Sequence, residues 1–321
     1  MKKSTKTWLI VGAALVFIGI IIFITLICAT GGDFMKISTT KYETNTYKIN
    51  ESFNSVAVIT NTADIEFVYT NELTPTVVCY ERENAKHSVK TENDTLTLEI
   101  VDTRKWYYYI GINFVTPKIT VYLPSGEYGD LTVTSNTGNI KLCEDFKFKS
   151  IDVSTSTGDV FCCSSATEAI KIKTNTGKIR VDGISARSLE LSVSTGYLSV
   201  TDTSCGTDLK TTVSTGELQV TDTKCKSFIS VGGTGDVNLI NVIAEERLSI
   251  ERSTGDVEFE ACDAGEIFIK TSTGDVEGSL LSEKVFIVNT STGDKDVPNT
   301  ITGGRCEITT GTGDVEIYIK N

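Results

Sequence analysis

The sequence has few of the residues and motifs that most often carry catalysis. Its 321 residues include one histidine, His87, and the motifs G-x-S-x-G, H-E-x-x-H and the P-loop do not occur. These absences exclude the common signatures of serine hydrolases, zinc peptidases and nucleotide-binding enzymes. We therefore expect a protein that is not an enzyme and has no cofactor. His87 lies in the charged stretch 81–90, and we expect it to be a solvated loop residue.

Positive charge is also scarce. The chain carries a net charge of −12, and its first 28 residues hold three lysines and no acid, so the remaining residues together carry −15. Nucleic acids and anionic lipid headgroups attract clustered Lys and Arg. We therefore expect no nucleic-acid partner and no direct attraction of the acidic part to anionic lipid.

The nine cysteines include no C-x-x-C pair, which excludes zinc-ribbon and thioredoxin-type motifs. An unpaired cysteine behaves as a small buried apolar residue. We expect most of these cysteines to be free thiols in the core. The alternative is a set of disulfides, for which the best candidates are Cys143–Cys162 and Cys205–Cys225, because each pair recurs one repeat apart.

One long apolar run occurs near the N-terminus. Trp8–Cys28 contains 21 residues without a charge, which as a helix spans about 31 Å and is enough to cross a bilayer. A signal-peptide core is shorter, and Ile27 stands where a lipoprotein signal would have a small residue. The run predicts an uncleaved single-pass anchor. The lysines before it place the N-terminus in the cytoplasm and the bulk of the chain outside.

A Thr-Gly dipeptide recurs ten times at spacings of 19 or 20 residues. Helical repeats need about 33 residues and propeller blades about 40, so the period indicates a β-solenoid with two or three short strands per coil. Glycine suits the corner because a sharp turn often needs a positive φ. The ten glycines are Gly138, Gly158, Gly177, Gly196, Gly216, Gly235, Gly255, Gly274, Gly293 and Gly313.

Apolar residues alternate with polar ones on both sides of each corner. After Gly255, for example, Val257 and Phe259 flank Glu258. Period-two alternation gives each strand one buried and one exposed face. We expect the ten coils to stack at about 4.8 Å into a rod of about 48 Å. The pattern weakens at four positions, where the fit is poorer or a bulge is expected: Thr211, Ser230, Gly278 and Lys295.

These features predict an all-β parallel β-solenoid preceded by one transmembrane helix. Thr62–Phe67 resembles the later Thr254–Phe259, so the solenoid is expected to begin irregularly before the first Thr-Gly corner. No capping element is evident after Ile319, which predicts an exposed edge there. The expected divisions are a cytoplasmic stub (1–7), the transmembrane helix (8–28), a polar tether (29–44), an irregular β region (45–130) and the regular β-solenoid (131–321).

An aspartate follows the corner glycine in five of the later coils. Stacking would place these carboxylates in rows about 5 Å apart, where a divalent cation would relieve their repulsion. Calcium binding is thus one hypothesis, and the alternative is that aspartate is a good turn residue with a solvated side chain. The calcium candidates are Asp236, Asp256, Asp275, Asp294 and Asp314.

Two further patterns carry candidate contacts. A Thr-x-Thr pair precedes several corners, and its parity predicts hydroxyl ladders facing the interior or the corner instead of a ligand. In the aromatic run, Trp106, Tyr107 and Tyr109 are candidates for contact with a partner or with the membrane interface. The alternative for this run is packing within a covered edge or loop.

The segment Ile119–Pro124, then Leu131–Val133 and the serial Thr-Gly-Asp-Val repeats resemble the bacterial putative-adhesin family of β-strand-repeat domains. The resemblance covers about residues 45–321. It implies an anchored protein of the bacterial cell membrane that binds an unknown surface ligand or envelope protein. Three functions stay open: an adhesin or interaction module, an accessory protein of an envelope-stress response, and a spacer rod. A polysaccharide-cleaving solenoid is the enzymatic alternative, which a single acidic cleft would indicate.

Overall fold

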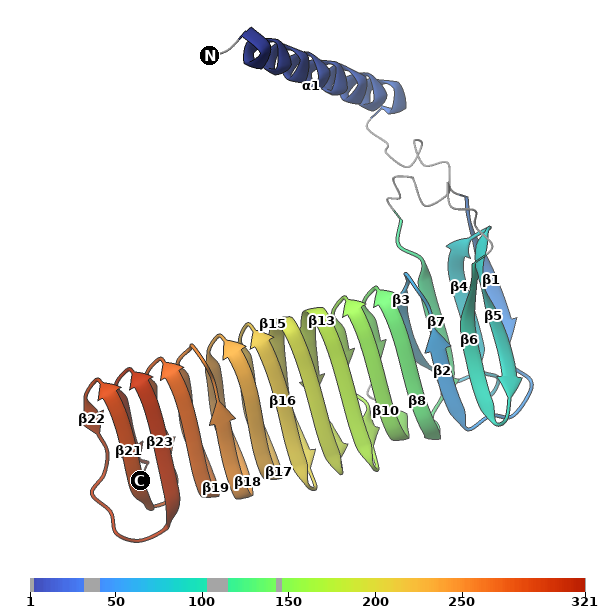
Figure 1. Cartoon of the computed structure of the whole chain (residues 1–321). Helices are drawn as coiled ribbons and strands as arrows, with labels where there is room; N and C mark the ends of the chain where they lie inside the picture. Colours follow the sequence, from blue (N-terminus) through green and yellow to red (C-terminus); the bar gives the residue numbers. More distant parts are fainter. Residues whose placement is uncertain (1–2, 32–40, 103–114, 143–145, 321) are drawn as a thin grey trace.

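The computed structural model describes residues 3–31, 41–102, 115–142 and 146–320, and it consists of one helix and one long β-solenoid (Figure 1). The helix α1 (Lys3–Thr30) contains an apolar stretch, Thr5–Ala29, that is long enough to cross a membrane. None of that stretch is buried against the rest of the protein. It could therefore serve as a single-pass anchor or as a signal sequence.

The solenoid has about nine turns and follows the predicted repeat. In each regular coil one strand leads up to the Thr-Gly corner and another follows it, and both pair in parallel with the same positions of the next coil. Ile151 thus pairs with Ile170, and Val160 with Ile179. The strands from the first to the last Thr-Gly coil are β8 (Gly126–Thr137), β9 (Ile140–Leu142), β10 (Phe146–Thr157), β11 (Val160–Cys162), β12 (Ser165–Ala166), β13 (Ala169–Asp182), β14 (Ser185–Ala186), β15 (Ser188–Cys205), β16 (Asp208–Thr215), β17 (Leu218–Thr234), β18 (Val237–Glu251), β19 (Val257–Thr273), β20 (Val276–Leu280), β21 (Lys284–Thr292), β22 (Lys295–Asp296), β23 (Gly304–Thr312) and β24 (Val315–Ile319).

The core is the inner face of these strands. The apolar positions around the corners are buried except at Gly293, in the last coil of the rod, where Phe286, Val288 and Val297 are partly buried. The weaker positions Thr211 and Ser230 are buried in register with each other. The bulge expected at Gly278 is present, because the pairing of β19 with β20 shifts register between Phe259 and Cys262. Close packing of side chains from successive coils makes one continuous hydrophobic core along the rod.

The buried cysteines belong to this core. Six cysteines are buried free thiols, which confirms the expectation that most of them lie unpaired in the core: Cys79, Cys162, Cys205, Cys225, Cys262 and Cys306. Cys205 and Cys225 are not bonded to each other, so the disulfide proposed for that pair is wrong. Cys143 lies outside the described residues.

Glycine is required at the corners for a steric reason as well as a conformational one. Their φ angles lie between 128° and 151°, and a Cβ at any of them would lie 1.7–2.3 Å from the backbone carbonyl oxygen of the neighbouring coil's corner. The Thr-x-Thr ladders support the same corner, as predicted. Thr174 is buried and its hydroxyl donates to the carbonyl of Gly158 at 3.1 Å. Each corner therefore requires glycine and packs directly against the corner of the neighbouring coil.

The first prediction concerns this corner. Gly216→Ala would place a methyl group 1.7 Å from the Gly196 carbonyl oxygen, so we expect a loss of at least about 3 kcal/mol of unfolding free energy. Gly206→Ala is the matched control, because its Cβ would meet nothing closer than 3.6 Å and we expect a change within about 1 kcal/mol. Denaturant unfolding of both variants measures the difference, and equal stabilities would contradict the steric account.

The last coils stack in an order that differs from the sequence. β23 pairs with β19 on one side and with β21 on the other, and β24 likewise lies between β20 and β22. The coil of residues 304–319 is therefore inserted between two earlier coils. The exposed edge is consequently β21 with β22, and the prediction of an edge after Ile319 is wrong. Figure 1 shows β21 and β22 at the far end of the rod.

The other end of the rod is covered by a cap in which the coil order is again changed. β2 and β3 stack on β8 and β9, and β6 and β7 stack outside them. Three antiparallel strands then extend the two sheets: β4 joins β7, β1 joins β4, and β5 joins β6. The strands of the cap are β1 (Tyr42–Lys48), β2 (Ser55–Ile59), β3 (Asp64–Thr70), β4 (Thr76–Arg82), β5 (Ala85–Glu92), β6 (Thr95–Asp102) and β7 (Lys118–Pro124).

A charged side chain without a counterion among the described residues interrupts the core of the rod. Arg252 is only 3% exposed, and within the described part of the chain the one hydrogen bond of its guanidinium runs from Nη2 to the Ser230 hydroxyl at 3.0 Å. Its Nε and Nη1 atoms have no partner among the described residues. Burial lowers the pKa of Arg252 to about 10. The guanidinium occupies space that Gly232 leaves free, since a Cβ at Gly232 would lie 1.7 Å from Nη1.

A buried charge without a counterion costs stability, which gives the second prediction. Arg252→Met keeps the unbranched chain and removes the charge, so we expect the unfolding free energy to rise by about 1–4 kcal/mol. The control is Arg305→Met, an exposed arginine beside Glu307, for which we expect a change within about 0.5 kcal/mol. A marked loss of stability in Arg252→Met would show that the guanidinium has partners that stabilise it.

Candidate functional site

The predicted aspartate ladder is present and has a clear structural role. Asp256 donates its backbone N–H to Oδ1 of Asp236 at 3.0 Å, and the same contact repeats along the corner through Asp275, Asp314 and Asp294. In an earlier coil Asn139 accepts the same bond from the Asp159 N–H at 2.9 Å. Since an amide oxygen serves equally well there, this ladder requires an acceptor and not a charge.

A second row of acids runs beside the first. Glu258 pairs in register with Glu277, and Glu277 with Glu316. Burial, and then repulsion by Glu316 and the neighbouring acids, raises the pKa of Glu277. At the corresponding positions nearer the cap stand Lys141 and Arg180. The strands that follow the corner therefore form a face of mixed charge toward the cap, where Lys141 lies 3.3 Å from Glu66, and an acidic face toward the far end.

The five aspartates do not meet as a cluster of three donor atoms. Within the described ranges, the group of three metal-ligating side chains whose donor atoms all lie within 4.8 Å of one another is Cys79, Glu81 and His87. Each aspartate in the ladder still has a second carboxylate oxygen, so calcium binding along the rows stays a prediction.

The third prediction tests the repulsion in the second row. The folded-state pKa of Glu277 is raised, so its ionised form is disfavoured above that pKa and the penalty fades as pH falls through it. We expect Glu277→Gln to raise Tm at pH 7 and to leave it unchanged at pH 3. The gain should shrink in high salt because this carboxylate is near solvent.

Glu190→Gln is the matched control, because the Glu190 carboxylate lies 3.6 Å from the Lys171 ammonium and has no repulsion to lose. The same measurement with calcium tests the metal hypothesis. Calcium bound along the row should raise the Tm of the unmodified chain more than that of Glu277→Gln. A Tm that does not respond to calcium or to a chelator would contradict calcium binding.

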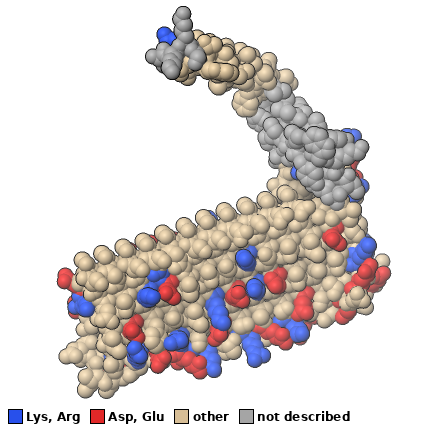
Figure 2. Space-filling model, viewed as in Figure 1, with Lys and Arg blue, Asp and Glu red and all other residues tan. Residues whose placement is uncertain are grey.

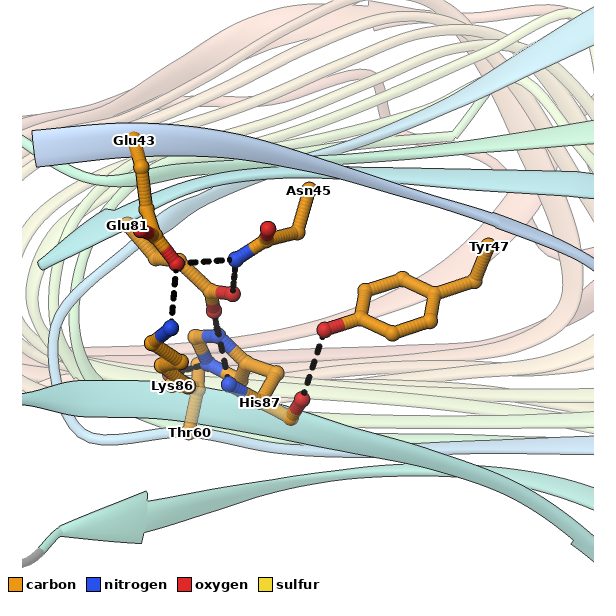
Figure 3. A network of polar contacts seen from close by, with 7 residues as sticks. All are labelled: Glu43, Asn45, Tyr47, Thr60, Glu81, Lys86 and His87. Carbon is orange, nitrogen blue, oxygen red and sulfur yellow. Dashed lines mark hydrogen bonds and ion pairs between the residues drawn. The ribbon is translucent and has the colours of Figure 1, made fainter. Parts of the chain in front are cut away.

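A buried polar network lies in the cap (Figure 3). His87 is on β5 and is 4% exposed, so the prediction of a solvated loop residue is wrong. Strand alternation explains the difference: Ala85 and His87 point inward from β5 while Lys86 points out and pairs with Glu43. The charged stretch 81–90 is thus two strands that each turn one polar side chain into the protein.

Glu81 is the centre of this network. Its Oε2 lies 2.6 Å from His87 Nδ1 and accepts the His87 backbone N–H at 2.6 Å, and its Oε1 accepts from Asn45 Nδ2 at 2.8 Å. Burial by itself would raise the pKa of Glu81, but these hydrogen bonds and the attraction of His87 outweigh it and lower the pKa. On the far side of the imidazole, Nε2 lies 3.0 Å from the Thr60 hydroxyl.

The order Thr60, His87, Glu81 has the connectivity of a nucleophile, a base and an orienting carboxylate. Thr60 is only 3% exposed, however, and the cavity beside His87 has a volume of about 30 Å³. That volume holds about one water molecule and no substrate. The geometry therefore orders the imidazole without exposing it to a reaction partner.

The predicted aromatic contacts Trp106, Tyr107 and Tyr109 lie outside the described residues. The residues on either side of that segment are described. Asp102 pairs with Ala85, and the Val115 carbonyl accepts a hydrogen bond from Tyr42 Oη at 3.1 Å. Tyr42 begins β1, directly after the segment that connects to α1. Both ends of the aromatic segment are thus attached at the end of the cap where the chain arrives from the helix.

The comparisons with known proteins identify the fold family. The Toastrack DUF4097 model, a domain of unknown function that is not a known enzyme family, matches residues 53–240 and 208–321. No curated protein matches the chain.

Solved structures similar to this chain include three from Parabacteroides and Bacteroides species. A putative adhesin from Parabacteroides merdae has 12% identity and a TM-score of 0.46, with 74% of this chain and 96% of that chain covered. A putative lipid binding protein from Parabacteroides distasonis has 16% identity and a TM-score of 0.41, with 74% and 94% covered. A putative adhesin from Bacteroides fragilis has 15% identity and a TM-score of 0.39, with 88% and 98% covered. Because the family model matches most of the length of the chain, the chain belongs to the Toastrack DUF4097 family.

Proposed function

We propose that this protein is a non-enzymatic interaction module of the bacterial envelope, anchored by α1 with its N-terminus in the cytoplasm and its β-solenoid outside. The observation that carries the proposal is the polarised face of the rod. Toward the cap, basic residues such as Lys141 and Arg180 stand among acids such as Glu66, whereas the aspartate row from Asp236 to Asp294 and the glutamate row from Glu258 to Glu316 make the far end acidic. Such a face suits extended contact with a charged surface.

The exposed corner ridge adds a second surface of different character. The threonine of every Thr-Gly corner is exposed, and these threonines form an uncharged row, the corner ridge, beside the aspartate ladder. Figure 2 shows this upper ridge as a regular row without charged side chains, above the face of the strands that lead up to the corner, on which Lys and Arg are interspersed with Asp and Glu. Chemically distinct faces along one rod favour a binding role over that of a uniform spacer.

The second candidate function is that of an accessory protein in an envelope-stress response. The observation that favours it is the attachment of the segment carrying Trp106, Tyr107 and Tyr109 at the end of the cap nearest the helix. Aromatic side chains are enriched where proteins meet partners and where they meet the membrane interface. A membrane regulator would be within reach of such a segment.

The fourth prediction separates these functions by pull-down from crosslinked whole cells. The baits are the full chain, a Trp106→Ser, Tyr107→Ser, Tyr109→Ser variant, and a Glu258→Gln, Glu277→Gln, Glu316→Gln variant. For an adhesin we expect wall or foreign-surface material to be lost with the glutamine variant and kept with the serine variant. Loss of a membrane protein with the serine variant alone would establish the accessory function. Recovery that neither variant changes would contradict both and favour a spacer.

A further inference from the structure

The cap brings together three buried side chains of different donor type. Cys79 Sγ, a Glu81 carboxylate oxygen and a His87 ring nitrogen all lie within 4.8 Å of one another. Cys79 and Glu81 are two residues apart on β4 and so point to the same inner face, and both are at most 1% exposed. His87 faces them from β5. β4 extends the sheet of β7 and β5 extends the sheet of β6, so the three donors bridge the two sheets of the cap.

We propose that Cys79, Glu81 and His87 bind a divalent transition-metal ion of the zinc type that ties the two sheets of the cap together. A thiolate, a carboxylate and an imidazole are the donors that zinc uses in proteins, at about 2.0–2.3 Å from the ion. The mixed sulfur, nitrogen and oxygen set excludes magnesium and calcium, which prefer oxygen alone. Full burial removes the competition from bulk water that weakens exposed clusters.

The contacts that orient metal ligands are already in place around these donors. Ligating histidines usually hold a hydrogen-bond partner on the other ring nitrogen, and ligating carboxylates are themselves hydrogen-bonded. His87 has the Thr60 hydroxyl 3.0 Å from Nε2, which leaves Nδ1 to face Glu81 and the ion. Glu81 has Asn45 Nδ2 at 2.8 Å from Oε1, which leaves Oε2 to face the ion.

Without the ion, a short hydrogen bond holds two of the donors together. His87 Nδ1 and Glu81 Oε2 lie 2.6 Å apart, and an ion between them takes the place of the proton they share. Among the described residues no hydrogen bond to Cys79 Sγ is formed, so the thiol is available as the third donor.

The fifth prediction uses the full chain in detergent micelles, reduced and treated with a chelator. We expect cobalt(II) to bind one ion per chain and to give a thiolate-to-cobalt charge-transfer band, and we expect zinc to abolish the band and raise Tm. Cys79→Ser and His87→Gln should lose the band. Cys225→Ser is the matched control, because it also removes a buried free thiol but lies in the regular rod, and it should keep both band and Tm shift.

The unmodified chain alone can overturn the proposal, so the test does not depend on the variants folding. Absence of a thiolate band with cobalt, or an unchanged Tm with zinc, would show that the cluster is only a hydrogen-bonded network. A band that survives in folded Cys79→Ser and disappears in Cys225→Ser would place the metal elsewhere. Circular dichroism of each variant establishes that the β-solenoid is intact before the metal is added.

Discussion

The contact between successive corner glycines is the constraint on which the rest of the structure depends. At each corner the backbone of one coil lies against the carbonyl of the next so closely that no side chain fits, and the positive φ disfavours every residue except glycine. This contact fixes the register of stacking, because a slip of one residue would bring a Cβ against a carbonyl. With register fixed, the threonine before the glycine and the aspartate after it necessarily align in rows.

A solenoid built from such coils can arrange functional side chains in only two ways. Repeated positions become rows, as in the acidic pairs Glu258–Glu277 and Glu277–Glu316, and rows suit extended contact with a surface. A single constellation of unlike residues requires a place where the repeat is broken. The antiparallel cap is that place, and Cys79, Glu81 and His87 meet there because β4 and β5 follow different sheets after one shared pair, Arg82 with Ala85.

Sequence alone predicted the coil because period and parity are local properties. The Thr-Gly spacing and the alternation around Gly255 determine the corner and the buried face without knowledge of partners. The second corner was missed: Gly183, Asp202, Asp222, Asn241 and Ala261 all have positive φ. Four of these five are Gly, Asp or Asn, which tolerate a positive φ. Their recurrence at one position of the repeat could therefore have indicated the second corner.

His87 could not be placed from the sequence because its burial depends on contacts with other strands of the cap, such as the contact of its Nε2 with the Thr60 hydroxyl. Its strand β5 pairs with β6, and Glu81 of β4 lies against the imidazole. Local charge density around His87 indicated solvent, and the tertiary pairing of Glu81 with the imidazole overrode that indication. The burial of a polar residue inside a small β cap can be predicted only when its polar partner is also known.

The order of the last coils could not be read from the sequence for a related reason. β21 and β23 carry the same inward pattern, so either one could stack on β19. The observed order has a consequence for assembly. Among the described strands β21 pairs only with β23, and β22 only with β24, so residues 284–296 have no docking surface until residues 304–319 are in place. Residues 304–319 must therefore join the rod before residues 284–296. Until then the intervening residues form a loop, and the entropic cost of closing a loop grows only slowly with its length.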